Sequence, residues 1–264
     1  MTLVRANGLT LHIQVLTPDA VPQPRTAVLL HGLASDTMAS WYFTLAYPLV
    51  EMGFRVLLLD LRGHGRSERP AHGYALDDFV DDLEALLTSH GGPGPYHLFG
   101  NSFGGTIAYA YAARHPDRVA GIVAVESSPP TTAWFARLRR RLGELAAAVS
   151  EPRALATAGA RRGARVQRRA REAGRLLAQT TLRAELSFAR LPDPARIAAI
   201  ECPVLCLYGD RSHVAELADE TRKLLPQAES RVFAGQKHSL LIDRPDEVRA
   251  AVTTWLRAQI HLGG

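Results

Sequence analysis

Gly100-Asn101-Ser102-Phe103-Gly104-Gly105 is a G-x-S-x-G stretch with one further glycine, and its surroundings are as informative as the motif. It follows the short apolar run 96–99 and precedes the Ala- and Tyr-rich segment 106–114, which a His-Pro pair ends. The pattern predicts a strand, a sharp turn and a helix, the arrangement of a nucleophile elbow. Glycines suit so tight a turn because side chains would not fit beside it. We therefore predict that Ser102 is a nucleophile exposed at the end of a strand.

A serine hydroxyl needs a general base, and the oxyanion that forms during acyl transfer needs hydrogen-bond donors. We predict His238 as the base, because it lies on a loop between the last expected strand and the last expected helix. The backbone N–H groups of Leu33 and Phe103 are predicted to form the oxyanion hole. His31, beside that loop, is expected to shape it through hydrogen bonds. Five other histidines are expected at the surface: His64, His72, His90, His115 and His261.

Strand-like and helix-like segments alternate over the first 130 residues and again after residue 200. Strands are expected at 9–15, 26–30, 54–60, 96–99, 119–125, 204–208 and 230–233, and helices at 41–52, 76–90, 106–114, from 214, and at 246–260. Such units predict an α/β protein with a mostly parallel sheet and helices on both faces. The intervening segment is rich in Ala, Arg, Leu and Glu and has no strand-like run. We therefore predict an α/β core at 1–128 and 197–264 and an inserted helical cap at 129–196.

Composition fits a globular protein, with 47% hydrophobic and 22% charged residues in 264. The N-terminus lacks the apolar run of a signal peptide, and no apolar segment is long enough for a membrane span. The two cysteines, Cys202 and Cys206, are expected on one strand at a separation of roughly 13 Å, too far for a disulfide. These features predict a cytoplasmic protein with two buried thiols.

The net charge of +5 hides a strong local asymmetry. Residues 131–200 hold 15 Arg against 5 acidic residues, an excess of +10, while the rest of the chain carries −5. The excess either attracts an anionic substrate or carrier, or it is a solvated helix face. The chain has only two lysines, so a general preference for Arg over Lys explains the residue type but not its clustering. Nucleic-acid binding is not expected, because few aromatic residues are interleaved with the arginines.

Four motifs together resemble those of the α/β-hydrolase family. They are Leu30-His31-Gly32, Asp60-Leu61-Arg62-Gly63-His64-Gly65-Arg66-Ser67, the stretch 100–105, and Gly235-Gln236-Lys237-His238. They occur in the family's order and spacing and span all of the chain except the cap. The resemblance implies the α/β-hydrolase fold, with an eight-stranded, mostly parallel sheet. It also implies a Ser–acid–His triad that works through a covalent acyl-enzyme, with no metal and no cofactor.

The acid is where this sequence departs from the family pattern. The family usually places it after the seventh strand, three residues beyond a glycine, and Ser212 stands there. Asp210 is near but out of register. Glu126 ends the preceding strand, where haloalkane dehalogenases and some polyketide thioesterases of this fold carry their acid. A carboxylate at either strand end could reach His238 Nδ1, because both strand ends face the same rim of the sheet. We favour Glu126 over Asp210, because Asp210 is out of register.

A serine at the elbow argues against the halide and epoxide branches of the family, which use aspartate. We expect a serine esterase or thioesterase acting on a hydrophobic acyl group. Phosphopantetheine-borne substrates on coenzyme A or an acidic acyl carrier protein would suit an Arg-rich cap, since Arg binds phosphate bidentately. The acyl tunnel is expected to be lined by Trp134, Phe135, Leu138 and Phe188. Two alternatives remain: a carbon–carbon bond hydrolase of the ring-cleavage-product type, and a non-catalytic small-molecule-binding member of the fold.

Overall fold

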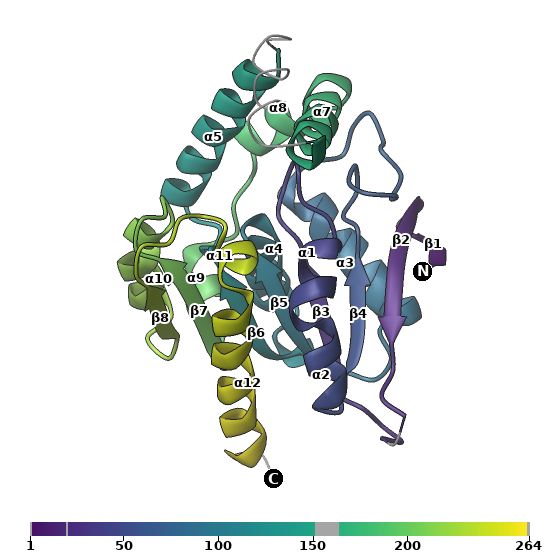
Figure 1. The fold of residues 1–264 in the computed structure, drawn as a ribbon, viewed down its shortest axis with the longest axis vertical. Coiled ribbons are helices and arrows are strands. Elements are labelled where there is room, and N and C mark those ends of the chain that lie inside the picture. Colours follow the sequence, from purple (N-terminus) through teal and green to yellow (C-terminus); the bar gives the residue numbers. More distant parts are fainter. Residues whose placement is uncertain (1, 20, 151–163, 263–264) are drawn as a thin grey trace.

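The computed structural model describes residues 2–19, 21–150 and 164–262. Its strands form one eight-stranded sheet in the order β1-β2-β4-β3-β5-β6-β7-β8 (Figure 1). Their bounds are β1 Thr2–Ala6, β2 Leu9–Leu16, β3 Thr26–Leu30, β4 Arg55–Leu59, β5 Tyr96–Asn101, β6 Val119–Val125, β7 Val204–Gly209 and β8 Glu229–Phe233. The β1–β2 and β2–β4 pairs are antiparallel, and the other pairs are parallel. The predicted eight-stranded, mostly parallel sheet is confirmed.

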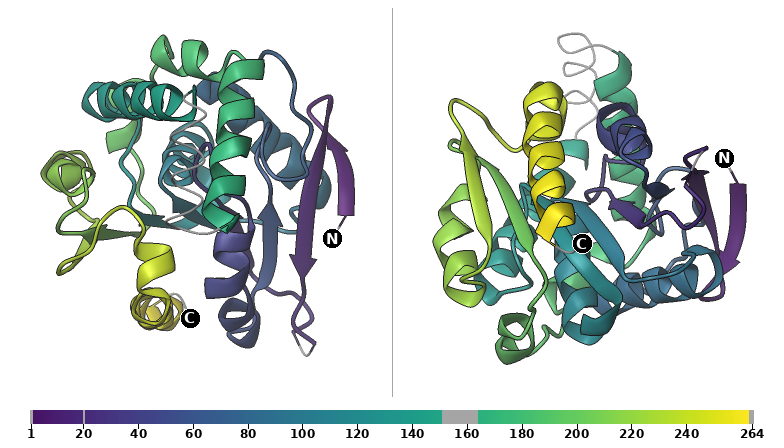
Figure 2. Two further views of the ribbon diagram at one scale, coloured as in Figure 1. Left: turned by 45° about the horizontal axis from the view of Figure 1, so that its top comes forward. Right: turned by 90° about the horizontal axis from the view of Figure 1, so that it is seen from below.

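Helices cover both faces of this sheet (Figure 2). Their bounds are α1 Ala39–Trp41, α2 Tyr47–Glu51, α3 Leu76–His90, α4 Phe103–Arg114, α5 Thr132–Ser150, α7 Ala164–Gln179, α8 Leu182–Ser187, α9 Pro194–Ala198, α10 Ala218–Leu224, α11 Leu240–Asp243 and α12 Pro245–Leu262. Side chains of β4 alternate between two hydrophobic clusters, with Leu57 and Leu59 in one and Val56 and Leu58 in the other. The central strands are apolar throughout because both of their faces are buried.

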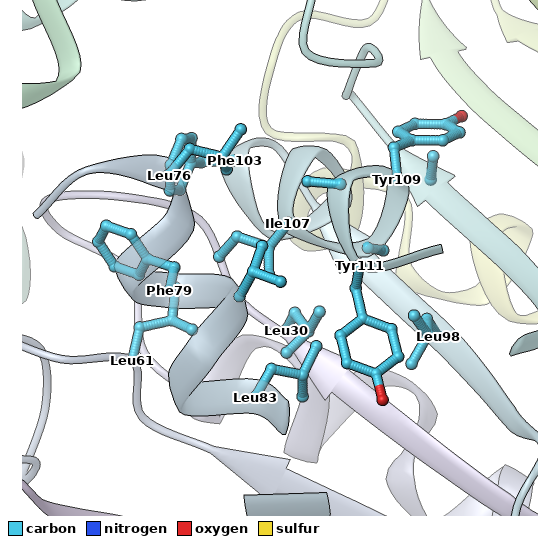
Figure 3. Close-up of a cluster of buried hydrophobic side chains, with 14 of the residues drawn as sticks. Leu30, Leu61, Leu76, Phe79, Leu83, Leu98, Phe103, Ile107, Tyr109 and Tyr111 are labelled. Carbon is cyan, nitrogen blue, oxygen red and sulfur yellow. The ribbon is translucent and has the colours of Figure 1, made fainter. Parts of the chain in front are cut away.

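The cluster shown in Figure 3 fixes α4, the helix that follows the elbow. Helix α3 contributes Leu76, Phe79 and Leu83, spaced so that they share one helix face. They meet Phe103 and Ile107 of α4, and the Phe79 and Phe103 rings lie edge to face with centroids 5.2 Å apart. This packing anchors the first turn of α4, so the end of β5 is held in place.

The expected helix at 41–52 is not a single α-helix. It consists of α1, a π-helical turn at Tyr42–Ala46, and α2. Pro48 has no N–H to donate to the carbonyl four residues earlier, so a regular α-helical bond is lost at this point. The wider π turn accommodates the missing donor.

Helices α5, α7 and α8 lie beyond the sheet, at the end of the molecule opposite the C-terminus (Figure 1). They fall inside the expected cap, 129–196, although residues 151–163 lie outside the described residues. The carboxylate of Glu185 joins α8 to the core by accepting the N–H groups of Gly73 and Tyr74 at 3.0 and 2.6 Å. The division into core and cap stays a prediction.

Across 2–19, 21–150 and 164–262, no helix is both long and apolar enough to cross a membrane.

Candidate active site

Ser102 sits at a sharp turn between β5 and α4, as the elbow pattern predicts. Its backbone has φ 52° and ψ −120°, a conformation that costs a non-glycine residue about 1–3 kcal/mol. The surrounding glycines are required by space, because a Cβ on Gly100 would overlap the Gly105 backbone and one on Gly104 would overlap the Leu30 carbonyl. The turn is fastened by the Ser102 N–H, which donates to the Val125 carbonyl at 2.8 Å.

His238 connects the serine to a carboxylate. It lies between β8 and α11, three residues after Gly235, whose φ is 74°. Its Nε2 is 3.0 Å from Ser102 Oγ, and its Nδ1 is 3.0 Å from Glu126 Oε2. The two ring nitrogens therefore face different partners, with 30% of the side chain still exposed. The structure brings together the three residues that the sequence analysis favoured.

Glu126 is fully buried at the end of β6, with a positive φ of 52°. Its Oε1 accepts the Gly209 N–H at 2.5 Å, and its Oε2 accepts from the Ser212 hydroxyl as well as facing His238. Ser212, which stands where the family usually has its acid, is thus a hydrogen-bond donor to the Glu126 carboxylate.

Asp210 occupies a different environment. It is exposed, and its Oδ1 accepts the Gln236 N–H at 3.2 Å. The geometry therefore pairs His238 with Glu126 rather than with Asp210.

The predicted oxyanion donors flank the serine. Phe103 follows it directly, and a Cβ on Gly32, the residue before Leu33, would lie 3.3 Å from the Ser102 Cβ. Within the described part of the chain, neither the Leu33 nor the Phe103 N–H has a hydrogen-bond acceptor. Two free donors beside a nucleophile are what oxyanion stabilisation requires.

Residues that the sequence analysis did not single out hold the Leu33 loop. Asp36 Oδ2 accepts the Gly32 N–H at 2.9 Å and Asn101 Nδ2 at 3.0 Å, so one carboxylate ties the loop to the elbow. As expected, His31 shapes the loop: its Nδ1 lies 2.7 Å from the Gly32 carbonyl, and its Nε2 accepts the Leu61 N–H at 2.9 Å. In the sequence, the one available signal for this role of Asp36 was its position four residues after Gly32.

The expectation that His64 lies at the surface is wrong. Its side chain is buried beneath the loop, and Nε2 accepts the Ala34 N–H at 2.9 Å. Burial, helped by nearby His31, lowers the pKa of His64 to about 3, so it stays a neutral acceptor. The turn at Gly63 and Gly65, both with positive φ, folds the ring inward. The motif 60–67 that carried the family resemblance contains this histidine and could have shown its structural role.

The four residues expected to line an acyl tunnel separate into two groups. Trp134, Phe135 and Leu138 are buried, whereas Phe188 is 89% exposed, so the expectation that Phe188 lines the tunnel is wrong. Helix α8 packs through Leu182 and Leu186, which leaves Phe188 on its outer side.

The described cap arginines lie largely on exposed surfaces, and several of them form ion pairs. Arg137 pairs with Glu216, Arg141 with Glu144, Arg169 with Asp36 and Arg175 with Glu172, at 2.6–3.6 Å. A cavity of about 210 Å³ lies between the loop at 34–39, the turn at 63–65 and helix α7. Its lining includes Arg69, Arg168 and Arg169, together with the acidic Asp36 and Glu172. In the residues described, no cluster of His, Cys, Asp and Glu suited to a metal ion occurs.

Comparisons with known proteins agree with this architecture. Residues 27–149 match the family model described as the alpha/beta hydrolase fold. A monoacylglycerol lipase of Mycolicibacterium smegmatis is 29% identical over 94% of this chain and 93% of its own length. A bifunctional esterase/perhydrolase of Acinetobacter calcoaceticus is 39% identical over only 45% of this chain and 42% of its own.

Among solved structures, a carboxylesterase of Nitrososphaera gargenis superposes with a TM-score of 0.82 at 22% identity, covering 98% of this chain and 99% of that one. At this level of identity, the likeness shows the fold alone. Together with the family match over residues 27–149 and the relatives, it leads to one conclusion: the chain has the α/β-hydrolase fold, and the comparisons support a serine hydrolase of the esterase and lipase type.

Proposed function

We propose that Ser102, His238 and Glu126 are the catalytic triad of an enzyme that hydrolyses esters of hydrophobic acyl groups. The observation that carries the proposal is the unbroken chain from Ser102 Oγ through both ring nitrogens of His238 to the buried Glu126 carboxylate, with 3.0 Å at each step. A neutral imidazole held between a hydroxyl and a carboxylate is the arrangement that activates serine.

In this mechanism, His238 Nε2 takes the hydroxyl proton as Ser102 Oγ attacks the ester carbonyl. The N–H groups of Leu33 and Phe103 stabilise the oxyanion, and Glu126 stabilises the imidazolium. His238 then protonates the leaving alcohol, which departs and leaves an acyl-enzyme. A water molecule, deprotonated by the same ring, releases the carboxylic acid and regenerates Ser102.

The test is hydrolysis of p-nitrophenyl esters of increasing acyl length, together with fluorophosphonate labelling of the serine. Wild-type protein should cleave the esters and be labelled, whereas the Ser102→Ala variant should do neither. Wild-type protein that is neither labelled nor active would instead support a non-catalytic binding role. Labelling without ester cleavage would keep the nucleophile and overturn the substrate class.

A second candidate, a thioesterase acting on coenzyme A or on an acidic acyl carrier protein, is supported by the Arg-lined cavity next to the Leu33 loop. Arg69, Arg168 and Arg169 border this space, and guanidinium groups bind phosphate bidentately. Asp36 and Glu172 in the same lining oppose an anion, so the ester proposal ranks first.

The free thiols of Cys202 and Cys206 support placing either activity in the cytoplasm.

One acyl chain presented as a coenzyme A thioester and as a p-nitrophenyl ester separates the two candidates. If the thioesterase proposal holds, Arg168→Gln should raise the thioester KM at low salt and leave the ester KM unchanged. Arg183→Gln is the matched control, since it is an exposed cap arginine outside the cavity lining. Equal thioester KM values for the two variants would exclude a phosphate-binding role for Arg168.

A further inference from the structure

Three aromatic rings form a row that leads from the cap to the proposed base. Trp134 of α5 lies nearly parallel to His213, with an interplanar angle of 16° and ring centroids 6.4 Å apart. His213 in turn packs on His238, with centroids 4.3 Å apart and planes tilted by 50°. His213 stands on the loop after β7, next to the Ser212 that donates to Glu126. The row therefore touches one face of the ring that bridges Ser102 and Glu126.

Helix α5 makes a second contact with His213, through its backbone carbonyl. Arg137, one turn after Trp134, donates from Nη1 to the His213 carbonyl at 3.1 Å and pairs through Nη2 with Glu216 at 2.6 Å. Trp134 is itself fixed, because its indole N–H donates to Thr106 Oγ1 of α4 at 2.7 Å and the ring is buried. The row is thus tied at its outer end to the helix that follows the nucleophile.

His213 lies near three arginines of helix α5 and near the ring of His238. Burial lowers the pKa of His213 to about 3, and nearby His238, Arg141, Arg137 and Arg140 push it in the same direction. The ring is therefore neutral over the range in which a serine hydrolase works. A neutral ring adds no charge repulsion when its neighbour takes up the serine proton.

We propose that His213 is a positioning residue whose ring holds the His238 imidazole in line between Ser102 and Glu126 and transmits the position of helix α5 to it. The physical reason is rotational freedom. His238 lies on a loop, 30% exposed, and two hydrogen bonds alone leave its ring able to rock about their common axis. A flat neighbour on one face removes that motion, and catalysis is sensitive to misplacement of this size. The inference rests on the proposed function, since it assigns His238 as the base.

The test compares His213→Phe, which keeps a flat ring, with His213→Ala, which removes it. The exposed His72→Ala serves as a control outside the site. We expect His213→Ala to lower ester kcat by about 10- to 100-fold with KM within about threefold, and His213→Phe to recover most of the loss. Wild-type kcat in His213→Ala would overturn the proposal. So would equal losses in the Ala and Phe variants, since the effect would then not come from the ring contact.

A spectroscopic readout keeps the inference separate from the proposed function. The proton between His238 Nδ1 and Glu126 should give a sharp downfield NMR signal in the wild type and in His213→Phe. In His213→Ala the signal should broaden through exchange with water. This measurement needs no substrate, so inactive wild-type protein would refute the proposed function while the signal still tested the positioning role. A signal equally sharp in all three proteins would overturn that role.

The link to the cap is tested by a double-mutant cycle between Arg137→Gln and His213→Ala. Arg137 is half-buried at the surface, so its replacement should leave the fold intact. If α5 acts on the base through His213, Arg137→Gln should lower kcat in the wild type and change it little in His213→Ala. Independent, multiplicative effects of the two substitutions would refute transmission from the cap.

Discussion

Replacing Glu126 with glutamine tests the proposed triad at its most buried member. The carboxylate has two oxygens and three donors: Gly209 N–H on Oε1, and the Ser212 hydroxyl and His238 Nδ1 on Oε2. An amide of the same shape has one oxygen and one NH₂ group. If its oxygen faces His238, the NH₂ meets the Gly209 N–H. If the NH₂ faces His238, it forces the proton onto Nε2, where the ring cannot accept from Ser102.

Both orientations are costly because Glu126 is fully buried and water cannot fill the missing role. One unpaired buried donor costs about 1–3 kcal/mol of stability. In the Ser-His-Asp template, an acid-to-amide replacement that imposes the wrong histidine tautomer lowers kcat by about 10⁴-fold. At 1.36 kcal/mol for each factor of ten, this corresponds to about 5 kcal/mol of lost transition-state stabilisation. KM should change little, since Glu126 has no access to the substrate.

The assay is p-nitrophenyl ester hydrolysis by purified Glu126→Gln, with Ser102→Ala defining the background rate. Asp210→Asn is the matched control: it makes the same chemical change at the exposed carboxylate that follows β7, the strand next to β6, and that accepts the Gln236 N–H. It should stay within about threefold of wild type, as surface substitutions usually do. A Glu126→Gln variant that keeps a tenth of the wild-type kcat, or an Asp210→Asn variant that falls equally far, would refute the assignment of the acid.

Three further predictions concern the buried polar groups. Ser212→Ala removes one donor to the proposed acid and should lower ester kcat by about tenfold; unchanged kcat would contradict this. Arg62→Met leaves Asp82 without its buried partner at 2.5–2.6 Å and should cost about 3–5 kcal/mol in urea unfolding. Burial lowers the pKa of His64 to about 3 and of His97 to about 4, from 6.5. As the pH falls, the histidines of the unfolded chain bind protons before the buried ones do. The free energy of unfolding should therefore be about 2 kcal/mol per histidine lower at pH 5 than above pH 6.5, as measured by urea titration under the two conditions.

Local sequence was sufficient for most of the framework. The glycines of 100–105 specify the elbow, because no other residue leaves room for the approach of α4 to Leu30. The apolar runs at 26–30 and 204–208 predict buried parallel strands, and the structure has strands there. The helix at 41–52 was predicted less well, since the effect of Pro48 on the hydrogen bonds of the preceding turn is not visible as a break in the apolar pattern.

Pairings between distant residues were harder to predict. His64 looks like a turn residue in the sequence, yet its ring lies under the Leu33 loop because two glycines with positive φ turn the chain inward. Phe188 looks like a pocket residue, yet the face that α8 buries excludes it. Asp36 lies outside the four motifs, and its role depends on Gly32 in the loop after β3 and on Asn101 at the end of β5.

By itself, the sequence determined the mostly parallel sheet, the elbow with Ser102, and the histidine that faces it, because strand and turn formation depend on neighbours along the chain. It left two carboxylates, Glu126 and Asp210, as candidates for the partner of that histidine. Only the tertiary structure decided between them. The ends of β6 and β7 are adjacent in the sheet, and the side chain directed at His238 Nδ1 is set by the backbone turn after each strand. The direction in which the Glu126 side chain leaves its turn depends on a contact across the sheet, between its N–H and the Leu207 carbonyl, which the order of residues does not contain.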